Sequence, residues 1–506
     1  MTILGAIDIG SNAMRLAVGK FSVRGELKVV QTMREPVRLG REVFRTGEMT
    51  PALMEQAVAA FLKFEKVLKF HKVSIVRAVG TSALRDARNS PSFIERVQRA
   101  VGIPIEVISG EEEARLVHVA VSHAVDIQKG VSLLIDIGGG SVEISVVDGG
   151  NIIFSDSLRM GTVRLLEVMR GRKKSPLLIE RLVREYAGGI KRQIQRGLGR
   201  KGITRAVGTG GNIETFGNLR RLLLGKTNTK VLQQDELVKI TDALKKLSLQ
   251  QRITNLKLRP DRADVIMPAG ALLCAILQES GVQRLVIPGV GLREGLLIDT
   301  YQGLDDQSDA EPLQRRAKQL SIFAREIGTR FGFDEKHSLH VVKLSLQIFD
   351  QTRLVHRLDG EARVFLELAC ILHDIGHVIS GRDHHKHSYY VIRESSFLGL
   401  TVEQKHLVAL IARYHRGNLP AIEHPEWRAL DVHARRLVMV CGGIIRLVEE
   451  LDREHLGRVS SLTLIRRRGA IDLVLKGRSQ LLVERLAAAE KKGMLELSLG
   501  VPIVIK

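Results

Sequence analysis

The sequence predicts an α/β protein in which two duplicated domains are followed by an all-α domain and a small α+β domain. The first observation is a repeat: Ile7-Asp8-Ile9-Gly10 recurs as Ile135-Asp136-Ile137-Gly138. The second is another repeat at the same spacing, because Ala78-Val79-Gly80-Thr81 recurs as Ala206-Val207-Gly208-Thr209. Both repeats are displaced by 128 residues (from 7 to 135 and from 78 to 206), which indicates two copies of one structural unit. The third is an almost wholly helical pattern from about residue 312, followed by short β-type runs from residue 459.

Each copy contains the same series of elements. A short apolar strand ends in Asp-Ile-Gly, and a second apolar run follows at hairpin distance, from Met14 to Lys20 and from Val142 to Val147. In the first copy, apolar residues at helical spacing between Leu53 and Leu68 predict an amphipathic helix, and Ile75 to Val79 predict the next strand. Strands that alternate with helices predict a mixed or parallel sheet covered on both faces.

The composition shifts give the domain boundaries. We expect duplicated domains at residues 1–125 and 126–305, a helical domain at 312–455 and a small C-terminal domain at 459–506, with a polar linker at 302–311. In the last domain, runs at 462–465 and 471–475 predict strands, 480–492 predict a helix, and 494–499 read as a further strand.

The composition also limits the function. Lys and Arg number 77 against 56 Asp and Glu, so the net charge of +21 favours polyanionic partners; a diffusely basic surface is the alternative. Nucleic acid is not expected, because aromatic residues make up 4% of the chain with one Trp, which leaves few stacking platforms. Three cysteines predict a reducing compartment. No apolar run reaches the ~20 residues of a membrane span and no signal peptide is recognisable, so we expect a cytoplasmic protein.

The two repeated turns predict a phosphate site. Asp8 is followed by Gly10, Ser11 and Asn12, and Asp136 is followed by Gly138, Gly139, Gly140 and Ser141. Glycine backbone can wrap an oxyanion, but the aspartates would repel phosphate unless a cation lies between them, and Asp136 suits Mg²⁺. The alternative is that the glycines only form tight turns that the aspartates cap. Two such turns at one repeat distance favour a site in a cleft between the copies.

Several motifs together resemble the exopolyphosphatase/guanosine pentaphosphate phosphatase family. They are A-I-D-I-G-S-N at 6–12, G-T-S-A-L-R at 80–85, I-S-G-E-E-E-A-R at 108–115, D-I-G-G-G-S-V-E at 136–143, G-T-G-G-N at 208–212 and G-V-G-L-R-E-G at 289–295. The resemblance extends from the first strand to about residue 300. It implies that the duplicated domains are ribonuclease-H/actin-like, as in the actin, sugar-kinase and Hsp70 superfamily.

The resemblance also implies roles for individual residues. Glu113 matches the catalytic base, whereas Glu111 and Glu112 read as a helix N-terminal charge cluster. The metal-binding carboxylates are Asp136 and Glu143, with Asp8 as a further candidate. The phosphate contacts are Ser11, Asn12, Arg85, Gly139, Gly140, Ser141 and Gly208. Arg262 and Arg293 are additional phosphate candidates near apolar runs, or else surface ion-pair residues, and Arg15 receives no role.

The implied function is Mg²⁺-dependent hydrolysis of the terminal phosphate of inorganic polyphosphate, with Glu113 as base for the attacking water. The alternative is a guanosine pentaphosphate 5′-phosphohydrolase, or both activities. A kinase or chaperone that uses ATP would need an adenosine site near residues 208–212. Family members commonly dimerise through C-terminal domains, so we expect a homodimer.

The helical domain carries a second motif. His340 precedes His373-Asp374, and the surrounding L-A-C-I-L-H-D-I-G-H resembles HD-type phosphohydrolases, where such residues bind metal. Glu449 stands where that family has Asp, which puts an intact dinuclear site in doubt. The alternatives are a structural domain, a metal bound without turnover, or a second active site. We expect His384, His385 and His387 in a solvated loop, although His387 and His415 are candidates to line the same pocket.

Overall fold

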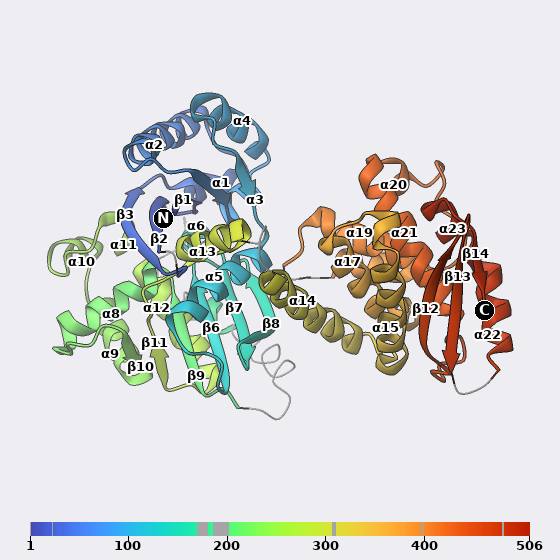
Figure 1. The fold of residues 1–506 in the computed structure, drawn as a ribbon. Helices are drawn as coiled ribbons and strands as arrows, with labels where there is room; N and C mark the ends of the chain where they lie inside the picture. The colour runs from blue at the N-terminus through green and yellow to red at the C-terminus, as the bar shows by residue number, and fades with distance from the viewer. Residues whose placement is uncertain are drawn as a thin grey trace. The chain divides into compact units, whose positions relative to one another are not determined.

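The computed structural model describes residues 2–22, 24–168, 181–185, 202–305, 310–395, 397, 399–477 and 480–506, and within these it describes no side chain at 305 or 310–315. The chain divides into two compact units, residues 1–309 (unit 1) and residues 310–506 (unit 2). Figure 1 labels their helices and strands. No helix in the described ranges combines the length and the apolar character that a bilayer crossing requires.

Unit 1 contains two sheets whose central strands have the same arrangement. The first has the order β3-β2-β1-β4-β5 and the second has the order β10-β11-β9-β6-β7-β8. The strands of the first are β1 (Thr2–Ile9), β2 (Met14–Phe21), β3 (Leu27–Glu35), β4 (Ile75–Gly80) and β5 (Ile105–Val107). Those of the second are β6 (Val131–Ile137), β7 (Val142–Asp148), β8 (Asn151–Leu158), β9 (Arg205–Thr209), β10 (Val231–Gln233) and β11 (Arg284–Val286).

The duplication is present in the strand pairing. β1 pairs antiparallel with β2 and parallel with β4, and β6 pairs in the same way with β7 and β9. In the two hairpins Asp8 lies opposite Arg15, and Asp136 lies opposite Glu143. Because the carboxyl ends of parallel strands lie at one edge of a sheet, the turns after β1 and β4 meet there, as do those after β6 and β9.

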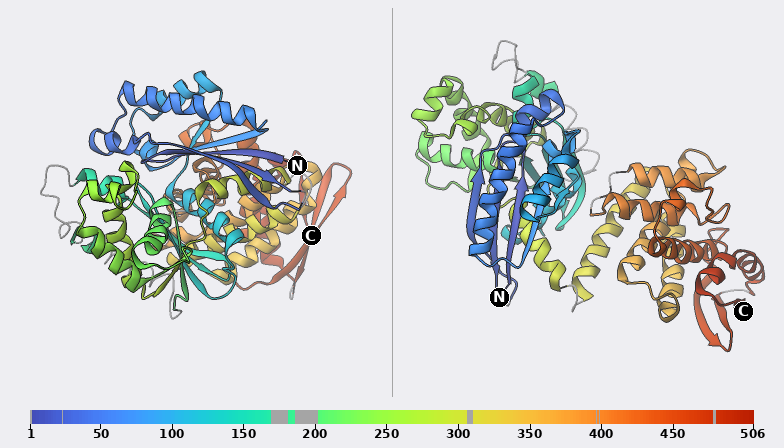
Figure 2. Two further views of the ribbon diagram at one scale, coloured as in Figure 1. Left: turned by 90° about the vertical axis from the view of Figure 1, so that its left-hand side faces the viewer. Right: turned by 90° about the horizontal axis from the view of Figure 1, so that it is seen from above.

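Helices cover both sheets. In the first copy they are α1 (Leu39–Thr46), α2 (Pro51–Phe70), α3 (Ser82–Asp86), α4 (Ser90–Val101) and α5 (Gly110–Ala124). The remainder are α6 (Thr162–Val168), α8 (Gly211–Leu224), α9 (Gln234–Lys245), α10 (Leu249–Thr254), α11 (Pro260–Ala263), α12 (Ile266–Ser280) and α13 (Leu292–Asp305). Helices α2 and α4 lie beyond one face of the first sheet (Figure 2). Helix α13 packs on β1, α5 packs on β7 and β8, and the two helices contact each other, so they join the two sheets.

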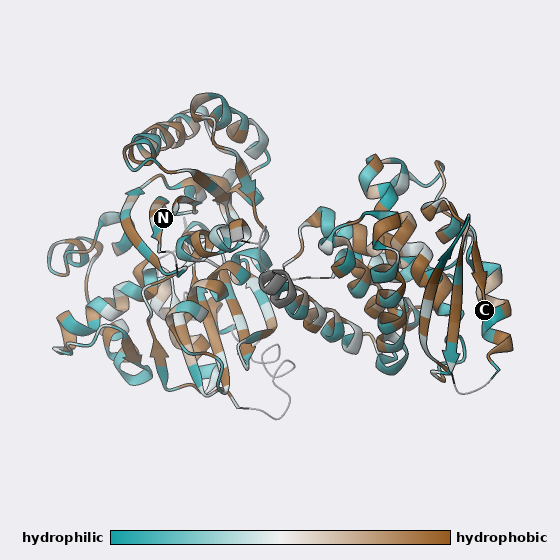
Figure 3. Cartoon of the chain, viewed as in Figure 1, coloured by the Kyte–Doolittle hydropathy of each residue, from teal (hydrophilic) through white to brown (hydrophobic). Residues whose placement is uncertain are grey.

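Helix α2 illustrates how sequence sets this packing. It begins where Thr50 accepts a hydrogen bond from the Leu53 amide at 3.3 Å, and Pro51 occupies the first turn, where its missing N–H costs nothing. Its predicted apolar face is buried in the core of the first copy, including Ala57, Phe61 and Phe64. A second core lies around the six-stranded sheet, whose strands are mostly hydrophobic (Figure 3).

Unit 2 is a helical bundle with a small three-stranded sheet of order β12-β13-β14. Its helices are α14 (Ala310–Arg330), α15 (Glu335–Gln351), α16 (Arg353–His356), α17 (Gly360–Leu372), the 3₁₀ turn η1 (Ile375–Val378), α18 (His384–Glu394), α19 (Val402–Arg413), α20 (Pro425–Arg428), α21 (Val432–Glu449), α22 (Leu482–Lys491) and α23 (Gly493–Leu499). The strands are β12 (Val459–Arg467), β13 (Ala470–Gly477) and β14 (Ile503–Ile505).

Three sequence expectations in and near unit 2 need correction. The expected strand at 494–499 is helix α23, and the third strand comes later, at β14. The expected linker at 302–311 is largely helical, because α13 continues to Asp305 and α14 begins at Ala310, while residues 306–309 lie outside the described part. The expected histidine loop is the first turn of α18, in which His384 and His385 are buried.

Candidate active site

The two repeated turns of unit 1 meet at one cavity. A methyl group added to Gly139 would lie 3.2 Å from the amide nitrogen of Asn12 and 3.2 Å from Cβ of Ser11, so the two turns approach each other closely at this glycine. The cavity has a volume of about 110 Å³. Its lining residues include Asp8, Ser11, Asn12, Arg15, Thr81, Ser82, Glu113, Asp136, Gly138, Gly139, Gly140, Ser141, Gly210, Gly211, Asn212, Glu214, Arg262, Arg293 and Glu294.

The glycine turn after β6 is arranged to receive an anion. The carbonyl oxygens of Gly138, Gly139 and Gly140 accept hydrogen bonds from the amides of Thr162, Val163 and Gly161 at 3.1, 2.8 and 3.1 Å. The amides of Gly139 and Gly140 donate no hydrogen bond to any residue in the described part of the chain. Backbone N–H groups that are free to face a cavity are suitable donors to phosphate oxygens.

The cross-strand pairs at this edge differ in charge between the copies. In the first copy the Arg15 guanidinium donates to Asp8 Oδ2 at 2.9 Å, which neutralises that carboxylate locally. In the second copy the residue opposite Asp136 is Glu143, another carboxylate. Like charges directly opposite each other on neighbouring strands are destabilising unless a proton or a cation compensates them. The second copy therefore lacks the cross-strand cation that the first copy has at this position.

The pKa values in the cavity reflect this crowding. Burial, reinforced by Glu143 and Asp8, raises the pKa of Asp136 to about 7. Burial also raises the pKa of Glu143, although Ser157 donates a hydrogen bond to its Oε1 at 2.9 Å. Protons are retained more easily on such carboxyls, and a divalent cation would replace them.

Glu113 lies in the first turn of α5. That helix begins at Ser109, whose hydroxyl accepts a hydrogen bond from the Glu112 amide at 3.2 Å. The Glu113 carboxylate is 8% exposed and pairs with the Arg85 guanidinium at 3.2 Å, and Arg85 also donates to the Ile108 carbonyl at 2.7 Å. Burial and the nearby Glu143 raise the pKa of Glu113 well above its ordinary value. A carboxylate with a raised pKa is a stronger base for water.

The donors present suit Mg²⁺. Glu143 Oε2 is buried and accepts no hydrogen bond within the described part of the chain, so it is available as a ligand. Among the described residues, no three ligand atoms of the cavity carboxylates lie within 4.8 Å of one another. Mg²⁺ usually binds through one or two carboxylates, retained water and substrate phosphates, so it does not require a tight protein cage.

The remaining lining residues are positioned by side-chain contacts. The Arg262 guanidinium donates to Asn212 Oδ1, and the Asn212 amide donates to the Ile137 carbonyl at 2.9 Å. Burial next to Arg15 lowers the pKa of Arg262 to about 9. The Asn12 amide donates to the Asp261 carbonyl at 3.1 Å, which fixes its side chain at the cavity wall.

Most sequence-predicted residues meet here. Asp8, Ser11, Asn12, Glu113, Asp136, Gly139, Gly140, Ser141, Arg262 and Arg293 line the cavity. Arg85 contacts the lining residue Glu113, and Glu143 lies opposite Asp136. Gly208 does not line the cavity, because a methyl group there would meet Ile213 and Leu285; Gly210 and Gly211 line it instead. Sequence reasoning missed Arg15, although the hairpin spacing that pairs it with Asp8 was a usable signal.

In unit 2, the predicted metal residues come together with one substitution. Glu449 Oε2 lies 3.0 Å from His373 Nε2, and Asp374 Oδ2 lies 3.6 Å from that same nitrogen. His337, one helical turn before the predicted His340, supplies the second imidazole, with its Nε2 3.2 Å from Glu449 Oε2. His340 lies outside this cluster.

The comparisons agree with the geometry of unit 1. The model of the Ppx/GppA phosphatase family matches residues 20–303, and that of Ppx/GppA phosphatase domain III matches residues 321–485. An Aquifex aeolicus Ppx/GppA family structure is 27% identical, covers 60% of this chain and 99% of that chain, and gives a TM-score of 0.51. A second structure, of the Aquifex aeolicus PPX-GPPA enzyme, is 29% identical over 59% of this chain and 99% of that chain, with a TM-score of 0.50.

An exopolyphosphatase from Cytophaga hutchinsonii is 25% identical over 60% of this chain and 98% of that chain, with a TM-score of 0.55. The duplicated sheets of unit 1 thus have the expected actin-like fold of this family, and its members support a phosphatase activity. The chain belongs to the Ppx/GppA phosphatase family.

Proposed function

We propose that this chain is an exopolyphosphatase that hydrolyses the terminal phosphate of inorganic polyphosphate and releases orthophosphate. The observation that carries the proposal is the position of Glu113. Its buried carboxylate is paired with Arg85 and lines the same cavity as the free amides of Gly139 and Gly140. A water-activating base and a phosphate cradle therefore face one small space.

The chain's own groups account for binding and orientation. The amides of Gly139 and Gly140 and the side chains of Ser11 and Asn12 are donors for the non-bridging oxygens. Arg262 also lines the cavity and adds positive charge. Phosphoryl transfer to water requires little covalent chemistry from the protein, so this positioning and charge neutralisation supply most of the rate.

Glu113 would take the proton from the attacking water. Burial and Glu143 raise the pKa of the Glu113 carboxyl, which strengthens it as a base for water. The ion pair with Arg85 fixes the orientation of this carboxylate. Asp136 and Glu143 would hold Mg²⁺, with Asp8 nearby, and the ion would supply charge neutralisation for the phosphate oxygens. Because Asp8 is already paired with Arg15, we assign the main ligand role to the second copy.

The net charge of +21 and the exopolyphosphatase relative favour a long polyanionic substrate. Guanosine pentaphosphate carries the same terminal phosphoanhydride and is the alternative substrate.

The test compares the wild-type protein with Glu113→Gln and with Glu111→Gln, a matched change two residues earlier in the same helical turn. Phosphate release is measured from long polyphosphate, from guanosine pentaphosphate and from ATP, with Mg²⁺ present. We expect Glu113→Gln to lower kcat by about 10²–10⁴-fold and Glu111→Gln to stay within about twofold of the wild type.

Two results would count against the proposal. If Glu113→Gln keeps the wild-type rate on every substrate, Glu113 is not the base. If the wild type turns over guanosine pentaphosphate or ATP but not polyphosphate, the substrate assignment is wrong and the hydrolytic site stands. Removing divalent ions with a chelator should abolish release, and added Mg²⁺ should restore it.

A further inference from the structure

We propose that unit 2 binds a pair of divalent transition-metal ions bridged by Asp374. Two groups of ligand atoms in this unit lie close enough to hold an ion, and both include Asp374. The first position comprises His337, His373, Asp374 and Glu449. The second position comprises Asp374, His377 and His384, with His415 beside them, and of these three histidines only His377 belongs to the H-D-I-G-H motif of the sequence.

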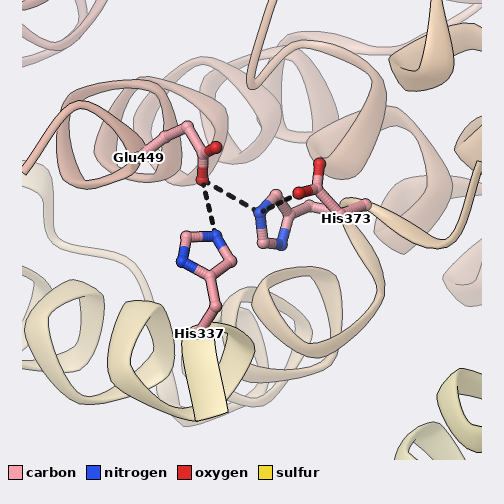
Figure 4. A group of neighbouring side chains, drawn as sticks. His337, His373 and Glu449 are labelled. Carbon is pink, nitrogen blue, oxygen red and sulfur yellow. Dashed lines mark hydrogen bonds and ion pairs between the residues drawn. The ribbon is translucent and has the colours of Figure 1, made fainter. Parts of the chain in front are cut away.

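The first position draws its ligands from separate elements. His337 comes from α15, His373 and Asp374 follow the end of α17, and Glu449 ends α21. The Glu449 carboxylate points between the two imidazole rings, and one of its oxygens lies 3.2 Å from His337 Nε2 and 3.0 Å from His373 Nε2 (Figure 4). One Glu449 oxygen therefore lies within 3.2 Å of both imidazoles, where a shared ion would be held.

The histidines are oriented as metal ligands are. In each of four rings the Nδ1 atom faces an oxygen that only accepts hydrogen bonds, so Nδ1 carries a proton. The four contacts are His337 to Asp452 Oδ2 at 2.9 Å, His373 to the Cys370 carbonyl at 2.8 Å, His384 to the Gly381 carbonyl at 3.2 Å and His415 to the Ala412 carbonyl at 2.6 Å. Such outer contacts fix the tautomer of metal-bound histidines and leave the Nε2 lone pair for the ion.

The inward-facing atoms need a cation between them. The Nε2 atoms of His384 and His415 lie 3.1 Å apart, and Asp374 Oδ1 lies 3.2 Å from the first and 3.7 Å from the second. Both rings are buried, and Asp374 Oδ1 accepts no hydrogen bond of ordinary geometry from any residue that the structure describes. Lone pairs that face one another in a buried space are unfavourable, and either extra protons or metal ions must compensate them.

Asp374 is suited to bridge two ions. Its Oδ2 lies 3.6 Å from His373 Nε2 in the first position, whereas its Oδ1 faces the imidazoles of the second. Ions in two-metal sites lie roughly 3.5–4 Å apart, a spacing that one carboxylate spans. Imidazole and carboxylate ligands together favour borderline ions such as Mn²⁺, Fe²⁺, Co²⁺ or Zn²⁺ over Mg²⁺.

The test is metal content of the full-length protein. The wild type is stripped with a chelator, equilibrated with Zn²⁺, passed through a metal-free gel-filtration column and analysed for zinc by mass spectrometry. We expect two Zn²⁺ per chain. Asp374→Asn should lose both ions, whereas His384→Gln and His415→Gln should each retain one. Loading with Co²⁺ should give visible absorption bands that shift in the same variants.

Two control variants separate the metal site from general folding. His433→Gln changes an exposed histidine on α21, the helix that carries Glu449, and should keep both ions. His340→Gln should also keep both, while His337→Gln should lose at least one, which separates the observed ligand from the one that sequence selected. Circular dichroism spectra confirm that each variant is folded.

Three outcomes would overturn the proposal. A stripped and reloaded wild type that retains no zinc means that protons alone compensate the cluster. Retention of both ions by folded Asp374→Asn excludes the bridge. If the wild type binds a single zinc and both His384→Gln and His415→Gln keep it, the second position is excluded.

Discussion

At the scale of single residues, the duplicated strand turns have diverged in charge, and the difference is the basis for assigning the proposed cation site to the second copy. Asp8 is neutralised by Arg15 across the first hairpin, whereas Asp136 faces Glu143 across the second. The first turn thus lines the cavity with a paired aspartate, whereas the second turn offers a candidate cation site. A duplicated sequence alone predicts two equal turns, so this asymmetry depends on which residue lies opposite each aspartate.

Gly210 allows Asp136 to take its position. A methyl group there would lie 2.4 Å from Asp136 Oδ1, and the residue has a φ of 85°. We expect Gly210→Ala to displace that carboxylate and to lower kcat by more than tenfold, with an added backbone cost of about 1–3 kcal/mol, because φ 85° with ψ 151° is a region that almost only glycine adopts. Gly225→Ala is the control, because Gly225 also has positive φ, at 67°, but has no neighbouring atom within 4 Å. Urea unfolding and phosphate release measured on both variants separate strain from displacement; equal activities would contradict the prediction.

His118 predicts a pH dependence of stability. It is buried in α5 with its Nε2 2.9 Å from the Gly150 carbonyl, and burial lowers its pKa to about 4. Between the ordinary value of about 6.5 and pH 4 the unfolded chain binds a proton that the folded chain does not, so the free energy of unfolding falls as the pH decreases through this window. Above pH 6.5 the contribution is fully present.

We expect His118→Gln to reduce the loss of unfolding free energy between pH 7.5 and pH 5 by about 2 kcal/mol, because Gln does not titrate. Urea titrations at both pH values measure this. His123→Gln, an exposed change on the same helix, should keep the wild-type pH dependence. An unchanged pH dependence in His118→Gln would mean that the buried imidazole does not contribute.

The sequence predicted many of the site residues because local motifs carry them, but it failed where orientation decides. His337 and His340 lie three residues apart on α15, and both are plausible ligands by spacing alone. Only the packed structure shows that His337 lies between Asp452 and Glu449. The same limit explains Gly208, whose motif was recognised although its neighbours Gly210 and Gly211 face the cavity.

At the scale of elements, helix α5 couples local folding to the proposed catalysis, because its cap Ser109 directly precedes the turn that contains the proposed base Glu113. Ser109→Ala removes a hydroxyl that accepts a hydrogen bond at 3.2 Å, and Thr50→Ala removes the equivalent 3.3 Å contact of α2. Each change should cost about 1 kcal/mol of stability. Only Ser109→Ala should also lower kcat, by several-fold, because fraying there moves Glu113. Thermal unfolding and phosphate release check both; an equal fall in kcat in the two variants would contradict this.

Elements were predictable where their periodicity was long. The 20-residue helix α2 and both hairpins were expected from apolar spacing. Short segments were not, and Met494 to Leu499 folds as helix α23 although its alternating side chains suggest a strand. Six residues carry too little pattern, and packing of Met494 and Leu495 on Gly442 and Gly443 of α21 decides the outcome.

At the scale of the whole molecule, unit 1 corresponds to what the solved relatives contain. Those structures are covered over 98–99% of their own length by 60% or less of this chain, and the family model of the phosphatase ends at residue 303. A chain with those elements alone therefore suffices to form the actin-like fold. Unit 2 adds a domain with its own buried polar cluster.

We accordingly expect a chain that ends at residue 309 to fold and to release phosphate from short polyphosphate at a rate within about tenfold of the full-length protein. The reason is that the hydrophobic cores of both sheets and all residues that line the cavity lie in unit 1. The same chain should retain no tightly bound Zn²⁺ after gel filtration, because the histidine cluster lies in unit 2. Circular dichroism, phosphate release and metal analysis on the two lengths measure this. A folded short chain that is inactive would show that unit 2 is required for hydrolysis. If the short chain retains two zinc ions, the metal pair lies in unit 1 and its assignment to unit 2 is wrong.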